Sequence, residues 1–190
     1  MKAGACGVAA GILATAFVLG CSGAKEPPPD GNLQMRVFAG QEDPTVCKIA
    51  HNMQIAKKGG SPPSHEVNQP GGRVEDGSEG FSVSCSIHGK DQFSITGSIN
   101  GSAAAFSFSG NVAKGGSGQG SIAQYSSQFQ ATVASPADAP CTFYVDKDPL
   151  QVAPGRIWAR FECPKILDTS LPTTTTCAAS GEFIFENCSE

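Results

Sequence analysis

The sequence predicts a mainly β protein, an antiparallel β-sandwich or small barrel of about 7–8 strands that is braced by disulfides. In several segments apolar and polar residues alternate, which is the pattern of strands with one buried face. The chain of 190 residues holds Gly 23 and Pro 13, which favours many turns and few long helices. An even number of cysteines in the body of the chain is the third observation, because they can pair with one another.

The first part of the predicted domain is less regular than its centre. Residues 33–37 alternate as an opening strand. Residues 44–57 fit two structures equally well. Asp43-Pro44 is a suitable start for a short helix, whereas the spacing of apolar residues up to Ile55 also fits a strand. Residues 59–79 are rich in Gly, Pro, Ser and acids and predict a long loop.

The clearest alternation lies between residues 80 and 133. Asn100-Gly101 is a preferred pair for a two-residue hairpin turn, and the glycine-rich residues 115–120 predict a flexible hairpin loop. The outward positions are mostly serine, so we expect an antiparallel meander with one wet face. The alternating runs are residues 81–88, 93–99, 104–112 and 125–133.

Three further strands complete the prediction, at residues 141–145, 156–163 and 182–187. An antiparallel pairing of the first two could set Cys141 opposite Cys163, so we favour a disulfide between these two residues.

The cysteines of the body predict three disulfides, as is typical of exported proteins. Their connectivity is otherwise open, because six cysteines allow about 15 pairings. No C-x-x-C spacing occurs in the chain, so we expect neither a metal site nor a cofactor. The six residues are Cys47, Cys85, Cys141, Cys163, Cys177 and Cys188.

Residues 1–20 have the features of a secretory signal, with Lys2 followed by an uncharged apolar stretch and small residues. The segment Val18-Leu19-Gly20-Cys21 resembles the lipobox of bacterial lipoproteins. This resemblance implies that Cys21 is lipidated and becomes the new N-terminus, so that the chain is anchored in a membrane. Ser22, in place of Asp, favours the outer membrane by the sorting rule of that family.

Cleavage before Cys21 would divide the chain into three parts. Residues 1–20 are the signal peptide, and residues 21–32 are the lipidated cysteine with a proline-rich tether. Residues 33–190 form a single β-rich domain. The proline run of the tether favours stiff polyproline II, so we expect the domain to stand a short distance from the bilayer.

The charge balance and the missing motifs narrow the function. Lys+Arg 13 against Asp+Glu 17 gives a net charge of −4 without a basic stripe, so we expect no nucleic-acid partner. No G-x-S-x-G motif is present, and His65-Glu66 is not part of a metalloprotease motif. We therefore expect no enzyme and assign no catalytic residue.

One surface feature indicates a contact site. Arg156, Trp158 and Arg160 fall on the outward face of a predicted strand, and Trp and Arg are favoured at binding hot spots. Thr142 and Tyr144 extend that face onto the neighbouring strand. The alternative is that Trp158 packs in a second layer with the arginines stacked over its ring.

The sequence thus predicts a non-enzymatic lipoprotein of the cell envelope. Its disulfide-stabilised β domain would have a structural or interaction role, with an envelope protein or a polysaccharide as partner. The alternative is a module that binds a glycan or another small ligand on the sheet face centred on Trp158.

Overall fold

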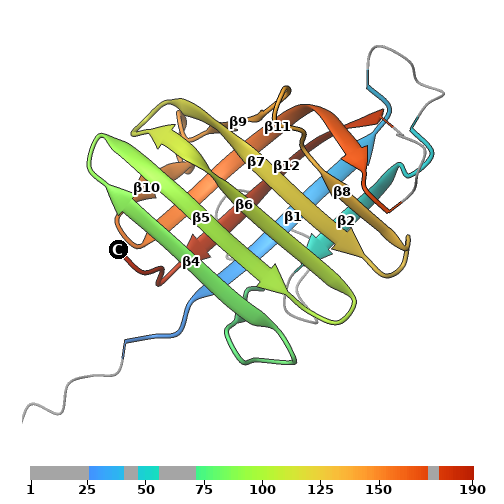
Figure 1. Ribbon diagram of the computed structural model, residues 1–190. Helices are drawn as coiled ribbons and strands as arrows, with labels where there is room; N and C mark the ends of the chain where they lie inside the picture. Colours follow the sequence, from blue (N-terminus) through green and yellow to red (C-terminus); the bar gives the residue numbers. More distant parts are fainter. Residues whose placement is uncertain (1–25, 41–46, 56–71, 171–175) are drawn as a thin grey trace, which may run out of the picture.

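The computed structural model describes residues 26–40, 47–55, 72–170 and 176–190. Within these residues the chain forms twelve strands and no helix (Figure 1). The strands are β1 (Asp30–Phe38), β2 (His51–Ile55), β3 (Val74–Glu75), β4 (Ser82–Gly89), β5 (Gln92–Asn100), β6 (Ala104–Ala113), β7 (Ser117–Ser126), β8 (Ala131–Ala134), β9 (Cys141–Tyr144), β10 (Gln151–Ala153), β11 (Arg156–Asp168) and β12 (Thr176–Glu186).

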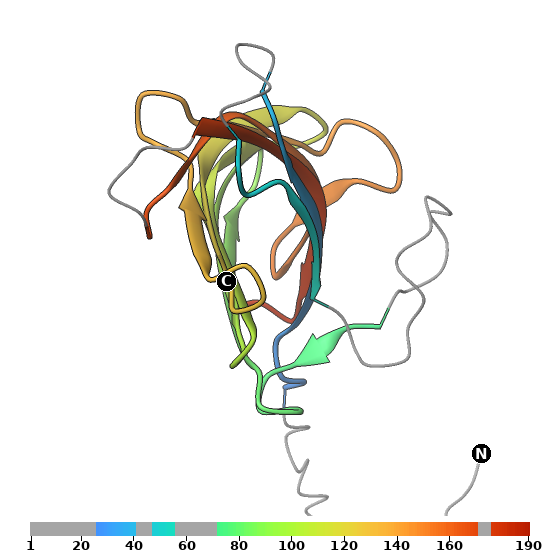
Figure 2. The same ribbon diagram turned by 90° about the vertical axis from the view of Figure 1, so that its right-hand side faces the viewer.

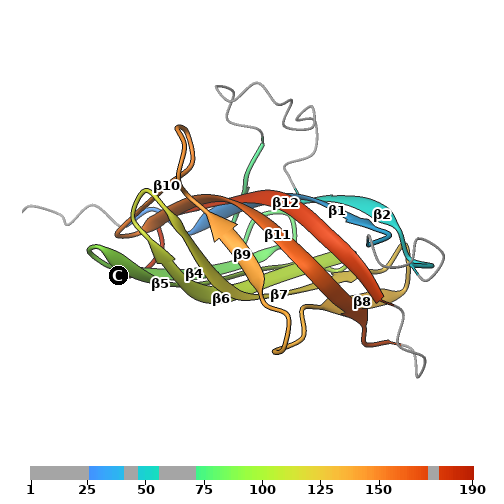
Figure 3. The ribbon, with the colours of Figure 1, turned by 90° about the horizontal axis from the view of Figure 1, so that it is seen from above.

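One sheet winds into a closed barrel with additional outer strands. Its order is β2-β1-β12-β11-β8-β7-β6-β5-β4, and β9 pairs with both β7 and β11. In Figure 1 the strands β4 to β7 cross in front of β1, β12 and β11 at a steep angle, as in orthogonal sheet packing. Figures 2 and 3 show the two curved walls that this winding places around the core.

The seam of the barrel lies between β4 and the end of the chain. The Ser189 N–H donates to the Cys85 carbonyl at 3.0 Å, and the Ile87 N–H donates to the Ser189 carbonyl at 2.9 Å. The Gly155 N–H donates to the Ile87 carbonyl at 3.1 Å, and a disulfide joins Cys85 to Cys188. These bonds occupy the edge of β4, which would otherwise expose unpaired backbone groups.

The core is built from phenylalanine rings on the inner faces of both walls. Phe108 and Phe183 stack with ring centroids 4.3 Å apart, and Phe143 meets Phe183 edge to face. Gly97 makes room for this cluster, because a Cβ atom there would lie 2.4 Å from Cε1 of Phe108. The most completely buried rings are Phe93, Phe106, Phe143, Phe161, Phe183 and Phe185.

All three predicted disulfides are present, and the favoured pair Cys141–Cys163 is confirmed. The pairing of Phe143 with Phe161 in the β9–β11 ladder brings these two cysteines opposite each other. The other bridges are Cys47–Cys177 and Cys85–Cys188.

The mainly β class is confirmed, but several details differ from the prediction. The possible helix at 44–57 is wrong for residues 51–55, which form β2, because His51, Met53 and Ile55 alternate inward and pair with β1. Residues 44–46 and 56–57 lie outside the described residues.

The other differences concern loops and the number of strands. The hairpin turn predicted at Asn100-Gly101 follows Gly101 instead, because Asn100 is the last residue of β5 and pairs with Ala105. Residues 117–120 belong to β7 instead of a loop. Glycine is required at Gly120 because a Cβ atom there would meet the Ser109 carbonyl oxygen at 2.1 Å. The strand count exceeds the predicted 7–8 because short strands such as β3 and β10 add to the sheet, β3 from within the predicted loop 59–79.

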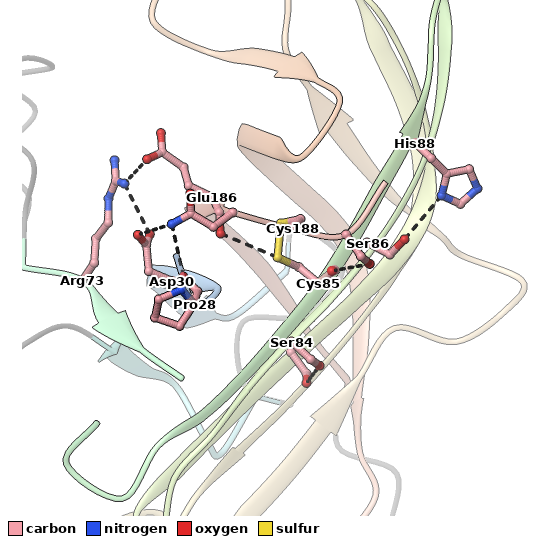
Figure 4. Close-up of a disulfide and its surroundings, with 12 residues drawn as sticks. Pro28, Asp30, Arg73, Ser84, Cys85, Ser86, His88, Glu186 and Cys188 are labelled. Carbon is pink, nitrogen blue, oxygen red and sulfur yellow. Dashed lines mark hydrogen bonds and ion pairs between the residues drawn. A yellow bond between two sulfur atoms is a disulfide. The ribbon is translucent and has the colours of Figure 1, made fainter. Parts of the chain in front are cut away.

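The chain enters the domain through Pro28, Pro29 and Asp30, which we call the neck. Figure 4 shows Pro28 and Asp30 of this segment. The Asp76 N–H donates to the Pro29 carbonyl at 2.9 Å, and Asn187 Nδ2 donates to the Pro28 carbonyl at 3.1 Å. The first strand therefore starts beside the end of the last one. Residues 28–32, predicted as tether, are part of the folded domain.

An ion-pair cluster secures the neck. Arg73 Nη1 lies 3.3 Å from Asp30 Oδ1 and also contacts Glu186 (Figure 4). Burial raises the pKa of the Asp30 carboxyl above its ordinary value, although the Arg73 guanidinium acts in the opposite direction. Asp30 is thus a partly desolvated carboxyl beside Arg73 and Glu186.

Candidate functional site

The candidate site lies on the outward face of the wall formed by β2, β1, β12 and β11. Because side chains alternate along a strand, the polar residues of these strands point away from the core. The register aligns them into two rows across the wall. The tyrosine row is Gln54, Gln34, Glu182, Arg160 and Tyr144, and the threonine row is Asn52, Arg36, Ser180, Glu162 and Thr142.

A groove of about 650 Å³ runs over these rows. Its volume is within the range of small-ligand sites. Its lining includes the backbone of Gly181, where a side chain would point inward, toward Met35 and Phe161. The lining residues are Gln34, Met35, Arg36, Asn52, Met53, Gln54, Arg160, Glu162, Ser180, Gly181 and Glu182.

Arg160 is held in place at one side of the groove. Its Nη1 lies 2.5 Å from Glu162 Oε1, and its guanidinium stacks over the Tyr144 ring at 4.4 Å from the centroid. The Tyr144 hydroxyl donates to Glu162 Oε2 at 3.4 Å. Glu182 is the neighbour of Arg160 in the register of β11 and β12. Arg160 therefore balances one of the two negative charges on this side.

Arg36 stands on the opposite side, on β1. It is exposed, and its guanidinium carbon lies 4.6 Å from the centroid of the Phe38 ring. Among the described residues no carboxylate forms an ion pair with it. The planar guanidinium thus presents donors to solvent in a geometry that suits a carboxylate.

The predicted contact residues share one outward face of β11, as the alternation implied. Arg160 lines the groove, and Trp158 occupies the next outward position, half-buried between its register partners Gln151 and Ile184. Arg156 is exposed and donates to Gln151 Oε1 at 3.2 Å. Arg160 stacks on Tyr144, which fits the prediction that Tyr144 extends this face onto the neighbouring strand.

Sequence reasoning missed the part of the groove that β1, β2 and β12 supply. The alternation in residues 33–37 was a usable signal. If Leu33, Met35 and Val37 point inward, Gln34 and Arg36 must point outward. What the sequence does not contain is the pairing of β1 with β12, which joins opposite ends of the chain.

The outward face of β4 to β7 carries a second hollow, of about 700 Å³, with a different chemistry. Serines line most of it, which confirms the predicted serine-rich face. Many of these hydroxyls satisfy one another across strands, for example Ser84 with Ser98 at 3.0 Å and Ser109 with Ser121 at 2.9 Å. This hollow has no charged lining residue, and its aromatic lining residue, Phe108, is buried, so we favour the groove as the functional site.

Three polar side chains are buried at the end of the barrel near β2. His51 Nδ1 lies 2.6 Å from the Ile49 carbonyl oxygen and therefore donates to it, while the ring stacks on Phe129. Gln124 Nε2 donates to the Met53 sulfur at 2.9 Å. Asp168 accepts from the Ser170 N–H at 2.8 Å. These contacts hold the end of the barrel together, and none of these three polar residues lines the groove.

Within the described ranges no group of three His, Cys, Asp or Glu residues is placed to hold a metal ion. No helix of the described chain is long and apolar enough to cross a membrane. Comparisons with protein-family models, with curated proteins and with solved structures found no match to this chain.

Proposed function

We propose that the protein is a non-enzymatic, lipid-anchored component of the cell envelope that binds a glycan in the groove. The observation that carries the proposal is the lining of the groove, where three side-chain amides, two arginines and two glutamates face solvent. Such groups donate and accept hydrogen bonds in the way that hydroxyl-rich ligands require.

The aromatic residues beside the groove support the same conclusion. Trp158 is half-buried, so part of its side chain is open to solvent. A rigid aromatic surface next to polar side chains suits a ligand that has both apolar faces and hydroxyl groups.

The N-terminus and the disulfides support the proposed location. The lipobox-like segment that ends at Cys21 would attach the mature chain to a membrane through acyl chains. Three disulfides are typical of a protein that folds in an oxidising compartment outside the cytosol. We expect the outer membrane as the anchoring membrane, because Ser22 follows Cys21.

Affinity electrophoresis of the full chain in detergent, with polysaccharides set into the gel, tests the proposal. We expect at least one polysaccharide to slow the wild-type protein, and the double variant Gln34→Ala, Gln54→Ala to lose most of the retardation. Gln92→Ala is the matched control, because Gln92 is exposed at the start of β5 and does not line the groove.

Two results would count against glycan binding. Equal retardation of the groove variant and of wild type would place the binding elsewhere. If no polysaccharide slows the protein and cross-linking on intact cells recovers one envelope protein through Arg160 or Trp158, the groove is a protein contact surface.

A further inference from the structure

We infer that the groove selects a glycan that carries both acetamido groups and widely spaced carboxylates. The inference rests on the glycan-binding function proposed above and names the class of ligand. The arrangement of charges and amides in the two rows carries it.

The preference for acetamido groups follows from the side-chain amides of Gln34, Gln54 and Asn52 in the groove. Gln34 and Gln54 are direct register partners on β1 and β2, and Asn52 faces Arg36 in the same ladder. Each of these side chains offers a carbonyl oxygen and an NH₂ group side by side. An acetamido group presents the complementary N–H donor and carbonyl acceptor on two separate atoms. A hydroxyl group has its donor and acceptor on the same oxygen.

The carboxylate preference follows from Arg36. Its guanidinium is exposed on the wall of the groove, and within the described residues no acid pairs with it. The guanidinium lies over the Phe38 ring, with the carbon 4.6 Å from the ring centroid. A planar, oriented fork of N–H donors is the geometry that binds a carboxylate through two parallel hydrogen bonds.

The spacing of carboxylates follows from the other charges. Glu162 is neutralised by Arg160 at 2.5 Å, and Glu182 lies beside Arg160 in the register. Two arginines and two glutamates line the groove, so its net charge is close to zero. A polymer with an acid on every sugar would bring a second carboxylate against Glu182. A polymer with acids on alternate sugars would place one carboxylate at Arg36 and a neutral acetamido sugar at the amides.

Three oligosaccharides separate these features. A hyaluronan hexasaccharide alternates uronate and acetamido sugars, chitohexaose has acetamido groups without acids, and hexagalacturonate has acids without acetamido groups. We expect isothermal titration calorimetry on the full chain in detergent to give a Kd for the hyaluronan hexasaccharide roughly tenfold lower than for either of the others.

Arg36→Gln should raise the Kd for the hyaluronan hexasaccharide roughly tenfold and raise that for chitohexaose by a much smaller factor. Lys114→Gln, in the turn after β6 on the other wall, is the control for lost positive charge and should change neither. An unchanged thermal unfolding curve of Arg36→Gln would show that the variant is folded.

The outcomes distinguish the inference from the proposed function. Equal affinity for chitohexaose and the hyaluronan hexasaccharide, or tightest binding of hexagalacturonate, would overturn the inference and leave glycan binding in place. The same applies if only an oligosaccharide of neutral, non-acetylated sugars binds. Failure of every saccharide, including the polysaccharides of the electrophoresis experiment, would overturn both.

Discussion

Cys85 and Cys188 are joined across the seam of the barrel, with their Cα atoms 4.8 Å apart and 103 positions apart in the chain. The bridge lies where the C-terminal residues follow the edge of β4, so it fixes the contact that closes the sheet. Cys141 and Cys163, by contrast, are bridged within a ladder that backbone hydrogen bonds already hold.

Removing the seam disulfide should therefore cost more than removing the ladder disulfide. By the loop-entropy argument, Cys85→Ser with Cys188→Ser should lower the free energy of unfolding by about 4–5 kcal/mol, against about 3 kcal/mol for Cys141→Ser with Cys163→Ser. Urea unfolding of both double variants and of wild type measures the difference. An equal loss in both variants would contradict the loop-entropy argument for the seam bridge.

Gly97 is predicted to be intolerant of even one methyl group. In Gly97→Ala the new carbon would meet the Phe108 ring at 2.4 Å, and this ring is buried in the phenylalanine cluster. We expect a loss of about 1–3 kcal/mol from overpacking. Gly116→Ala is the matched control, since its Cβ would have only ordinary contacts with Ala113 from 3.5 Å. Similar melting temperatures for the two variants would contradict the packing argument.

Asp30→Asn should alter the pH dependence of stability. Because burial raises the pKa of Asp30 in the folded state, the carboxyl binds its proton more readily when folded, and stability from this group falls as pH rises through that pKa. The amide mimics the protonated form without the desolvated charge. We expect the variant to be more stable than wild type at pH 7, and the two to converge at acid pH.

Urea unfolding between pH 3 and pH 7 measures this prediction. Arg73, Glu186 and Glu75 surround the carboxyl, and Arg73 keeps Glu186 as its partner in the variant. A constant offset between the two stability curves would show that the titration of Asp30 does not contribute. A less stable variant at pH 7 would show that the ion pair with Arg73 outweighs the cost of burial.

Cys21→Ala should abolish membrane retention. The side chain that would carry the acyl chains is lost, and no other residue of the lipobox-like segment can replace the thiol. Cell fractionation with Triton X-114 phase partition measures the effect, and Cys6→Ala within the predicted signal serves as control. If Cys21→Ala still partitions into the detergent phase, the lipid anchor is not at this residue.

The sequence predicts the strands that pair with their neighbours in the chain better than it predicts the groove. The alternation in β4, β5 and β6 identifies both the buried and the serine-rich face, because each of these strands pairs with the next one along the chain. The alternation of apolar and polar residues was sufficient to predict these strands. It was also sufficient to favour the disulfide Cys141–Cys163.

Two kinds of information were missing from the local pattern. Gly120 looks like part of a flexible loop, yet it is a strand residue that lets β7 pass close to Phe143. The groove needs Arg36 of the first strand beside Ser180 of the last one. Such a pairing depends on how the whole sheet closes, and the residues near Arg36 do not encode it on their own.

The position of β12 in the middle of the sheet has a consequence for biosynthesis. This strand pairs with β1 on one side and β11 on the other, and it supplies Phe183 and Phe185 to the core. A nascent chain can therefore form hairpins from β4 to β7 while it emerges, but it cannot join its first strand to the rest. The barrel can be completed only after β12 has been synthesised and released. A prematurely terminated product would therefore remain open and accessible to proteases.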